Sequence, residues 1–380
     1  MARVYARICR EYVLLTYNTY MQLEDRVLSV FPPPEFLSFP SAGIEISDGS
    51  VKHVLLRQRG DAAELVSYSE TPLPQGAVYQ GGIEAPEKVV EVLRSIRLRH
   101  GIHYANVSLP ERKAYLYETV VPEGAGNVRA SIEADLETHV PLPPGEAVFD
   151  FDRLQKTNGG TAVSVTAYAR RIVHVYRQAF EKAGITLRVL ETESHALARA
   201  ALAGERASGT VMVIDSGKRA TRVVVSENGT VVFTATIDIG GDSLTAALMK
   251  RFAISQVEAE QMKDEKGFLM SAENMDVVEA MIATLSVVKE EIGKYLSYLQ
   301  DPVNDRRRTV ERVIVCGGNA NLRGFPEYLE SALGLPVAYA NVWSGAFSLD
   351  EYIPPMPFSE SLEYATAIGL AKRGNPNMPW

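Results

Sequence analysis

The sequence predicts an α/β protein built from two related halves. Residues 211–214 form an apolar strand that runs into Asp215, a turn containing Gly217, and a second strand that starts at Arg222. A similar strand–turn–strand unit occupies residues 43–52. Further strands and helical segments follow each unit, which is the pattern of a duplicated domain. An acid beside a small-residue turn is typical of a Mg²⁺-phosphate site, although such turns are also common in hairpins without a ligand.

The composition fits a globular protein of two or more domains, because the chain has 380 residues. Its 47 acidic and 39 basic residues give a net charge of −8, which disfavours a nucleic-acid binder. Cys9 and Cys316 are far apart, as expected in a reducing cytoplasm without a disulfide framework. With no apolar run of bilayer-spanning length and no signal-peptide pattern, we expect a cytoplasmic protein that reaches the membrane through a partner.

Residues 1–35 are predicted to be an N-terminal extension. Arg3, Arg7 and Arg10 lie on one helical stripe beside apolar residues. The stripe fits an amphipathic helix on an anionic membrane, or a helix packed on the protein itself, which we prefer because three arginines attract a membrane only modestly. Three consecutive prolines at 32–34 then end any helix.

The first half is predicted to start near Phe36 and to be interrupted by an insertion. Its strands are expected at 42–46, 51–57, 64–69 and 106–109, with a turn at 47–50 and a helix at 87–100 that ends at Gly101. The insertion, about 110–168, is a small β/α subdomain with strands at 114–120, 147–154 and 162–168 and a helix at 128–140. A helix at 170–183, closed by Gly184, and a strand end with a helix across 189–202 return to the first half.

The second half repeats the opening unit as a meander with strands at 211–214, 222–226 and 231–237. Gly240 and Gly241 precede a helix that is expected to start at Ser243, with Asp242 or Ser243 as its N-cap. The remaining elements are predicted in this order: a mostly helical region at 254–299, a solvated loop at Arg306-Arg307-Arg308, a strand at 310–315, a helix at 325–333, a strand at 337–339 and a last helix at 362–372.

This order of units resembles the superfamily of actin, the heat-shock chaperones and the sugar kinases. There, the first turn is the phosphate-1 loop, the second is phosphate-2, and a late Gly-Gly pair, here Gly317-Gly318, belongs to the adenosine motif. The position of the insertion is similar to that in the PilM proteins of type IV pilus assembly and the FtsA proteins of cell division. Residues 258–263 (EAEQMK) and 316–325 (CGGNANLRGF) look like the nucleotide-binding segments of that branch, and 138–143 (THVPLP) looks like the PilM insertion. The resemblance implies an actin-like, ribonuclease H-like fold with duplicated domains and an FtsA/PilM-type inserted subdomain.

The resemblance also implies a division into subdomains. The expected parts are the extension at 1–35, subdomain 1A at 36–109, 169–207 and 346–374, the inserted subdomain 1C at 110–168, subdomain 2A at 208–244 and 310–345, and subdomain 2B at 245–309.

The resemblance further implies a site for ATP and Mg²⁺. Asp215 and Glu45 are expected at the metal and its bound water, and Glu193, Glu191 and Glu45 are the candidates to position a water for hydrolysis. Glu191 and Glu193 also fit as simple helix-start acids, which we prefer, and His195 as a structural residue. The other expected nucleotide contacts are Ser47, Asp48, Gly49, Ser50, Lys52, Gly217, Lys218, Gly240, Gly241, Asp242, Glu260, Lys263, Gly317, Gly318 and Asn319.

The implied function is that of a cytoplasmic, ATP-binding scaffold of the inner-membrane platform of a type IV pilus or a related type II secretion system, with slow ATP hydrolysis at most. Its expected partner is the N-terminal cytoplasmic tail of a PilN-type membrane protein, held in a groove between the first domain and the insertion. PilO-like proteins, the assembly ATPase and self-association are further expected contacts. The alternatives are an FtsA-like cell-division protein, a small-molecule kinase of the superfamily, and a nucleotide-free adaptor.

Overall fold

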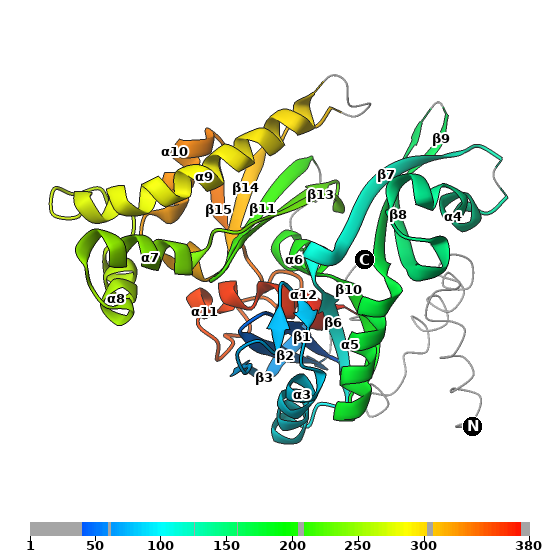
Figure 1. Cartoon of the computed structure of the whole chain (residues 1–380), viewed down its shortest axis with the longest axis horizontal. Helices are drawn as coiled ribbons and strands as arrows, with labels where there is room; N and C mark the ends of the chain where they lie inside the picture. The colour runs from blue at the N-terminus through cyan, green and yellow to red at the C-terminus, as the bar shows by residue number, and fades with distance from the viewer. Residues whose placement is uncertain are drawn as a thin grey trace. The chain divides into compact units, whose positions relative to one another are not determined.

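The computed structural model of the chain describes residues 40–59, 62–124, 126–157, 159–203, 209–301 and 307–373. The predicted N-terminal extension, with its arginine stripe and its prolines, lies outside these residues. From Ser41 onward the chain forms one compact unit. Two five-stranded sheets, in the lower and the upper part of Figure 1, confirm the predicted α/β class.

The first sheet has the strand order β10-β6-β1-β2-β3. Its strands are β1 (Ala42–Ile46), β2 (Ser50–Arg59), β3 (Ala62–Pro72), β6 (Tyr104–Leu109) and β10 (Thr186–Thr192). A short ribbon of β4 (Val78–Tyr79) and β5 (Gly82–Ile83) leads into α3 (Pro86–His100), which packs beside α5 (Arg170–Ala183) in the core of this half. Both helices end at the predicted glycines, Gly101 and Gly184, which adopt the left-handed conformation that glycine tolerates best.

The second sheet has the order β13-β12-β11-β14-β15. Its strands are β11 (Thr210–Ser216), β12 (Thr221–Glu227), β13 (Thr230–Ile237), β14 (Arg312–Cys316) and β15 (Val337–Tyr339). The helices of this half are α7 (Gly241–Phe252), α8 (Gln256–Lys266), α9 (Met275–Gln300) and α10 (Phe325–Leu333), with a short turn of helix η4 (Gly318–Asn321) after β14. Apolar side chains at helical spacing along α9, such as Met281, Leu285 and Ile292, join the same core as the strands.

The two sheets are duplicates in order, direction and irregularity. In each, the first strand pairs antiparallel with the second and parallel with the fourth, and the fourth pairs parallel with the fifth. Each also has a register shift between its second and third strands, at Leu55/Leu56 and at Val225/Ser226, which are 170 positions apart (55 to 225). A bulge kept at the same place indicates that both sheets have one ancestral design, as the repeated strand–turn–strand unit predicted.

The insertion forms a sheet of its own in the order β7-β9-β8. It comprises η2 (Glu111–Lys113), β7 (Ala114–Pro122), α4 (Val128–His139), η3 (Pro144–Glu146), β8 (Ala147–Thr157) and β9 (Gly160–Ala169). Asn127 caps α4 by accepting the N–H groups of Arg129 and Ala130, and Ile132 and Leu136 pack on the sheet in a separate small core. Because this core is separate from the other two, the insertion is a subdomain rather than a long loop.

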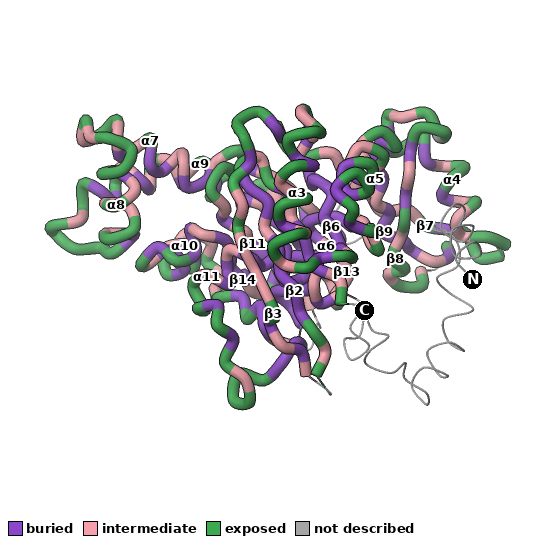
Figure 2. Tube along the Cα trace, turned by 90° about the horizontal axis from the view of Figure 1, so that it is seen from below, coloured by how far each residue is buried: buried purple, intermediate pink, exposed green. Residues whose placement is uncertain are grey.

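Three helices carry the chain between the halves. Helix α6 (Glu193–Leu202) links β10 of the first sheet to β11 of the second, and α11 (Phe358–Glu363) and α12 (Ala365–Lys372) follow β15 and return to β1. Helices α6 and α12 pack so closely that a Cβ on Gly369 would lie 2.6 Å from the carbonyl carbon of Ala196. Figure 2 shows that the tube is mostly buried at the sheets, whereas α8 is mostly exposed.

Three local predictions are wrong. Arg308, expected in a solvated loop, is 8% exposed because Glu118 and Glu227 bind its guanidinium at 2.6 and 3.2 Å. The last helix is broken at Tyr364, whose backbone leaves the helical conformation and so separates α11 from α12. Helix α7 starts two residues earlier than expected, with Gly240 at its N-cap, because the glycines fold onto the preceding hairpin.

Candidate functional site

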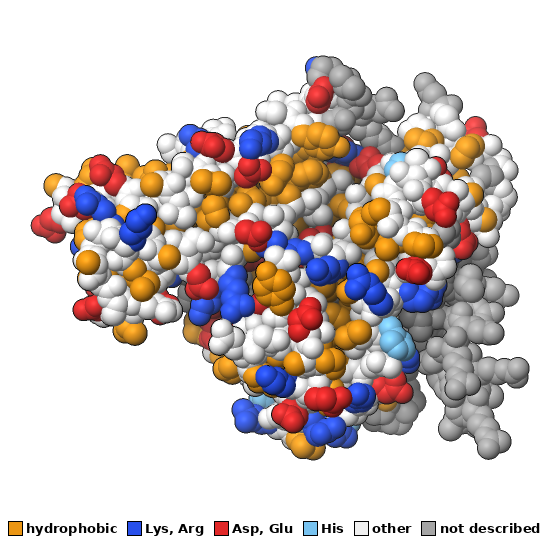
Figure 3. All heavy atoms as spheres, in the orientation of Figure 1, with side chains coloured by type: hydrophobic (Ala, Val, Ile, Leu, Met, Phe, Trp, Pro, Cys, Tyr) orange, Lys and Arg blue, Asp and Glu red, His pale blue; other side chains and the backbone are white. Residues whose placement is uncertain are grey.

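The tips of the β1–β2 and β11–β12 hairpins lie side by side. The carboxylate of Asp48 is 3.7 Å from the guanidinium of Arg219, and a Cβ on Gly49 would lie 3.8 Å from the same group. We call this region, residues 45–52 and 215–222, the hairpin junction. In Figure 3, Lys and Arg side chains form a band across the middle of the face, where the two sheets adjoin.

Each hairpin places a base directly opposite an acid. Glu45 pairs with Lys52 across β1 and β2, and Asp215 pairs with Arg222 across β11 and β12. The acids are 170 positions apart and so are the bases (45 to 215, 52 to 222). The sequence-based prediction gives Arg222 no role beyond starting a strand, although the shared spacing between acid and base is visible in the sequence. Paired strands bring these residues together, so the spacing is informative only once the hairpins are known.

Arg222 is the centre of the charge cluster in the hairpin junction. Its guanidinium binds Asp215 at 2.7 Å and Glu193 at 2.8 Å. Glu193 also accepts the backbone N–H of Glu111, at the start of the insertion, and Glu111 in turn accepts the N–H of Ser194. The predicted catalytic acid Glu193 therefore joins the hairpin junction to the insertion through hydrogen bonds on both of its sides.

Burial raises the pKa of two acids at this site, Glu45 and Glu193. It raises the pKa of Glu45 to about 7, against the attraction of Lys52 and Arg222, and the carboxylates of Glu193 and Asp215 add to the rise. Burial also raises the pKa of Glu193, and the ion pair with Arg222 offsets this only in part. The pKa of the Glu45 carboxyl therefore lies well above that of an exposed glutamate.

The glycines near the hairpin junction differ in whether the protein's own packing excludes a side chain. A Cβ on Gly240 would lie 2.6 to 2.7 Å from the backbone of the β11–β12 turn, and a Cβ on Gly317 would meet Asp215 and Ser216 at 2.5 Å. These two positions need glycine for the protein's own packing. A Cβ on Gly318 would lie 3.6 Å from Glu363, an ordinary contact, and Gly49 also has room. Gly318 and Gly49 are therefore not required by the protein's own packing, unlike Gly240 and Gly317.

Hydrogen bonds bring several predicted nucleotide contacts together. Asn319 donates to the hydroxyl of Ser216 at 3.1 Å and to the carbonyl of Gly217 at 2.8 Å. A Cβ on Gly241 would lie 2.7 Å from Asn319 and 3.4 Å from the ammonium of Lys263, which donates to Thr245. The predicted phosphate-2, adenosine and helix α8 contacts therefore lie around one point.

Other predicted contacts already have partners within the protein. Lys52 donates to the carbonyl of Glu363 at 2.8 Å, Asp242 donates its N–H to the carbonyl of Lys218, and Glu260 accepts from Gln256 along α8. In the first turn, the hydroxyl of Ser47 accepts the N–H groups of Gly49 and Ser50. The hydroxyl of Ser50 donates to Glu70, and Asp48 accepts the N–H groups of Gln80 and Gly81. The first turn therefore offers few free donors to a phosphate, because a serine stands where the second turn has Gly217.

Glu191 and His195 have structural surroundings. Glu191 lies at the end of β10 rather than at a helix start, and although burial opposes ionisation, Arg199, at 2.6 and 2.7 Å, and Arg373 lower the pKa of its carboxyl. The ring of His195 contacts Thr192 and Asp152. Neither group points to hydrolysis.

The fit of the two expected ligands differs. The exposed side chains of Lys218 and Arg219 on the second hairpin, together with Lys263 of α8 near Gly241, suit the phosphates of a nucleotide. Magnesium fits poorly, because one oxygen of the Asp215 carboxylate, Oδ2, is already paired with Arg222 at 2.7 Å. Within the part of the chain that the structure describes, no group of three or more His, Cys, Asp and Glu side chains could hold a metal ion.

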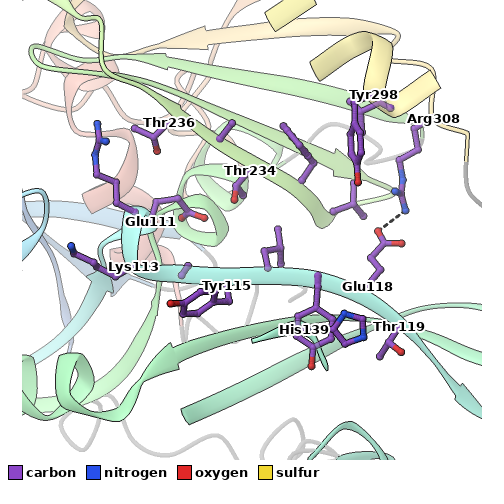
Figure 4. A pocket seen from close by; sticks show the side chains of 18 of the residues that line it. Glu111, Lys113, Tyr115, Glu118, Thr119, His139, Thr234, Thr236, Tyr298 and Arg308 are labelled. Atoms are coloured by element: carbon purple, nitrogen blue, oxygen red, sulfur yellow. Dashed lines mark hydrogen bonds and ion pairs between the residues drawn. The ribbon is translucent and has the colours of Figure 1, made fainter. Parts of the chain in front are cut away.

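A second candidate site is a groove of about 950 Å³ between β7 of the insertion and β13 of the second half (Figure 4). Both strands are the outermost of their sheets, so each presents an unpaired edge to the groove. The ring of His139 stacks on that of Tyr117 at 4.2 Å, and Arg308 pairs with Glu118 at the groove. Glu111 and Lys113 at the root of the insertion also line the groove. None of the helices among the described residues is both long and apolar enough to cross a membrane.

Comparison with known proteins agrees with this geometry. A sequence model of the family described as type IV pilus assembly protein PilM matches residues 43–375. The cell division protein FtsA of Streptococcus pneumoniae serotype 2 (strain D39 / NCTC 7466) is 30% identical over 184 residues. That match covers 44% of this chain and 40% of the relative, so the chain spans less than half of the curated protein it matches.

Solved structures show the same fold. The PilM-PilN type IV pilus biogenesis complex matches with a TM-score of 0.72 and 21% identity, over 88% of this chain and 98% of that chain. MreB5 of Spiroplasma citri bound to ADP matches with a TM-score of 0.54 and 13% identity, over 88% and 95%. The predicted actin-like fold is thus confirmed. Because the family match covers most of the sequence, the chain belongs to the type IV pilus assembly protein PilM family.

Proposed function

We propose that this protein is an ATP-binding scaffold of the inner-membrane platform of a type IV pilus or a related secretion system. It recruits the N-terminal cytoplasmic tail of a PilN-type membrane protein, which holds it at the inner face of the membrane. The observation that carries the proposal is the pair of duplicated sheets whose hairpin tips adjoin, in a chain of the PilM family. PilO-like proteins, the assembly ATPase and further copies of the chain are proposed as additional contacts.

ATP is proposed to lie at the hairpin junction. Its phosphates would face the β11–β12 turn, where Lys218 and Arg219 are exposed, and its base would occupy the space beside Gly318. Hydrolysis is slow at most, because Glu193 is held by Arg222 and by the backbone of Glu111 and is not free to orient a water. The nucleotide then acts as a switch, by favouring the arrangement of the halves that binds it better.

The tail is proposed to bind in the groove along β7. Two sheet edges supply backbone donors and acceptors for an extended peptide, and the aromatic side chains of Tyr115, Tyr117 and Phe233 supply apolar contact. The expected groove lay between the first domain and the insertion. The described cavity has the insertion as one wall and begins at its root, but β13 of the second half forms the other wall. A tail bound there would therefore contact both halves.

Isothermal titration calorimetry with ATP tests the nucleotide site. The change Gly318→Val should abolish ATP binding because it fills the space for the base, while the Cβ position itself is tolerated. Gly126→Val is the matched control, since a Cβ at Gly126 meets nothing within 4 Å. ATP binding that survives Gly318→Val, or is absent from the unmodified protein, would refute the ATP site.

A synthetic peptide with the N-terminal sequence of the PilN-type protein tests the groove. Thr234→Trp should remove peptide binding, because the side chain of Thr234 lines the groove. Val287→Trp, at a residue that is 46% exposed on α9, is the control that adds the same ring elsewhere. Equal peptide affinity in both variants would place the tail on another surface.

A further inference from the structure

The Asp215 carboxylate of the hairpin junction already holds a cation. The strand register places Arg222 opposite Asp215, and the two side chains are 2.7 Å apart. The other arm of the guanidinium binds Glu193 at 2.8 Å. Only 16% of the Arg222 side chain and 18% of the Asp215 side chain are exposed, so water screens this pair weakly.

A divalent metal would have to compete with this guanidinium. Magnesium prefers carboxylate oxygen and retains several waters, so it needs both Asp215 and the room beside it. To approach, it would have to come close to a positive group or expel Arg222 from between two carboxylates. The Nε of Arg222 is buried and has no hydrogen-bond partner among the described residues. The guanidinium is therefore held by its two acids, and the nearby carboxyl groups of Glu45 and Glu111 attract it as well.

The same region has basic groups that can neutralise phosphates directly. Lys218 and Arg219 occupy the β11–β12 turn and are exposed. Lys263 reaches the same area from α8, near Gly241, whereas Lys52 of β2 is engaged by the carbonyl of Glu363. A triphosphate bound here would meet several positive charges, which would neutralise it as a metal ion otherwise does.

We propose that Arg222 takes the place of Mg²⁺ in this protein, so that the hairpin junction binds ATP without a divalent metal. The inference rests on the proposed ATP site and departs from the metal that the sequence predicted. It makes Arg222 a positioning residue, which holds Asp215 and Glu193 neutralised beneath the phosphates.

The decisive measurement is the ATP affinity of the unmodified full-length protein by calorimetry, once with excess EDTA and once with excess MgCl₂. The two dissociation constants should agree within about threefold. A loss of tenfold or more in EDTA, about 1.4 kcal/mol, would overturn the inference while leaving the ATP site intact. No binding under either condition would overturn the ATP site and, with it, this inference.

Two variants sharpen the result. Arg222→Met frees both carboxylates for a metal, so its ATP binding should become magnesium-dependent by about tenfold or more. Arg251→Met is the control, because Arg251 is an exposed arginine 4.0 Å from Asp276 on another part of the second half. Metal-independent binding by Arg222→Met would count against the role of Arg222. If that variant does not fold, as a melting curve would show, the EDTA comparison on the unmodified protein decides alone.

Discussion

The contact between α6 and α12 predicts opposite effects for the same substitution at two helical glycines. Gly369 in α12 faces the backbone of α6, and a Cβ there would lie 2.6 Å from the carbonyl carbon of Ala196 and closer still to its oxygen. Gly293 in α9 has nothing within 4 Å of its Cβ position. The two sites therefore separate helix propensity from the closeness of packing.

The magnitudes follow from these distances. Alanine in a helix is more stable than glycine by about 1 kcal/mol, so Gly293→Ala should raise the free energy of unfolding by roughly that amount. At Gly369 the same gain is opposed by overlap with backbone, which cannot rotate away, and the helices must separate. Overpacking of this kind costs about 3 kcal/mol, so Gly369→Ala should lower the stability by about 2 kcal/mol.

Urea unfolding followed by far-ultraviolet circular dichroism measures both variants. The midpoint should rise for Gly293→Ala and fall for Gly369→Ala, with similar slopes. ATP affinity should fall for Gly369→Ala alone, since α6 carries Glu193 at its first turn. A Gly369→Ala protein as stable as the unmodified one would show that the two helices are not in the close contact described.

Three further predictions concern charged groups. Arg308→Met should lower the free energy of unfolding by about 3 kcal/mol, because it leaves Glu118 and Glu227 without their cation. Amide hydrogen exchange in β7 should become faster, and unchanged exchange would contradict this prediction. ATP and the tail peptide should alter each other's dissociation constant by one common factor, about fivefold. Glu193→Gln should reduce that factor, because Glu193 contacts both Arg222 and the backbone of Glu111. An equal factor in both proteins would exclude Glu193 as a link between the two sites. Burial lowers the pKa of Lys372 to about 7, from 10.5 in an exposed chain, so the folded protein binds fewer protons than the unfolded one between these values and its stability should rise with pH. From pH 7 to pH 9 the free energy of unfolding should rise by about 2 kcal/mol, and the melting temperature should rise with it. The melting temperature of Lys372→Met should not show this rise, so parallel pH profiles of the two proteins would contradict the prediction.

Local pattern was sufficient for most elements. Helices α5 and α10 and strands β1 and β15 have the predicted bounds, because apolar spacing and terminal glycines act within a few residues. Where a prediction failed, the deciding partner was distant in sequence. Arg308 looked solvated beside two other arginines, yet its acids come from β7 and β12.

The site divides in the same way. The two acid-and-turn units, the glycine pairs and the duplicated order of strands could be seen in the sequence, because each is a short motif with its own backbone requirement. Which charges meet was decided by the fold, since strand register brings Arg222 to Asp215 and the start of α6 adds Glu193. The sequence by itself determined that two related halves each carry an acid at a hairpin, because strand and turn propensities are local. Only the tertiary structure decided that one of those acids already has a cation, because that depends on side chains from separate elements sharing a space that water hardly enters.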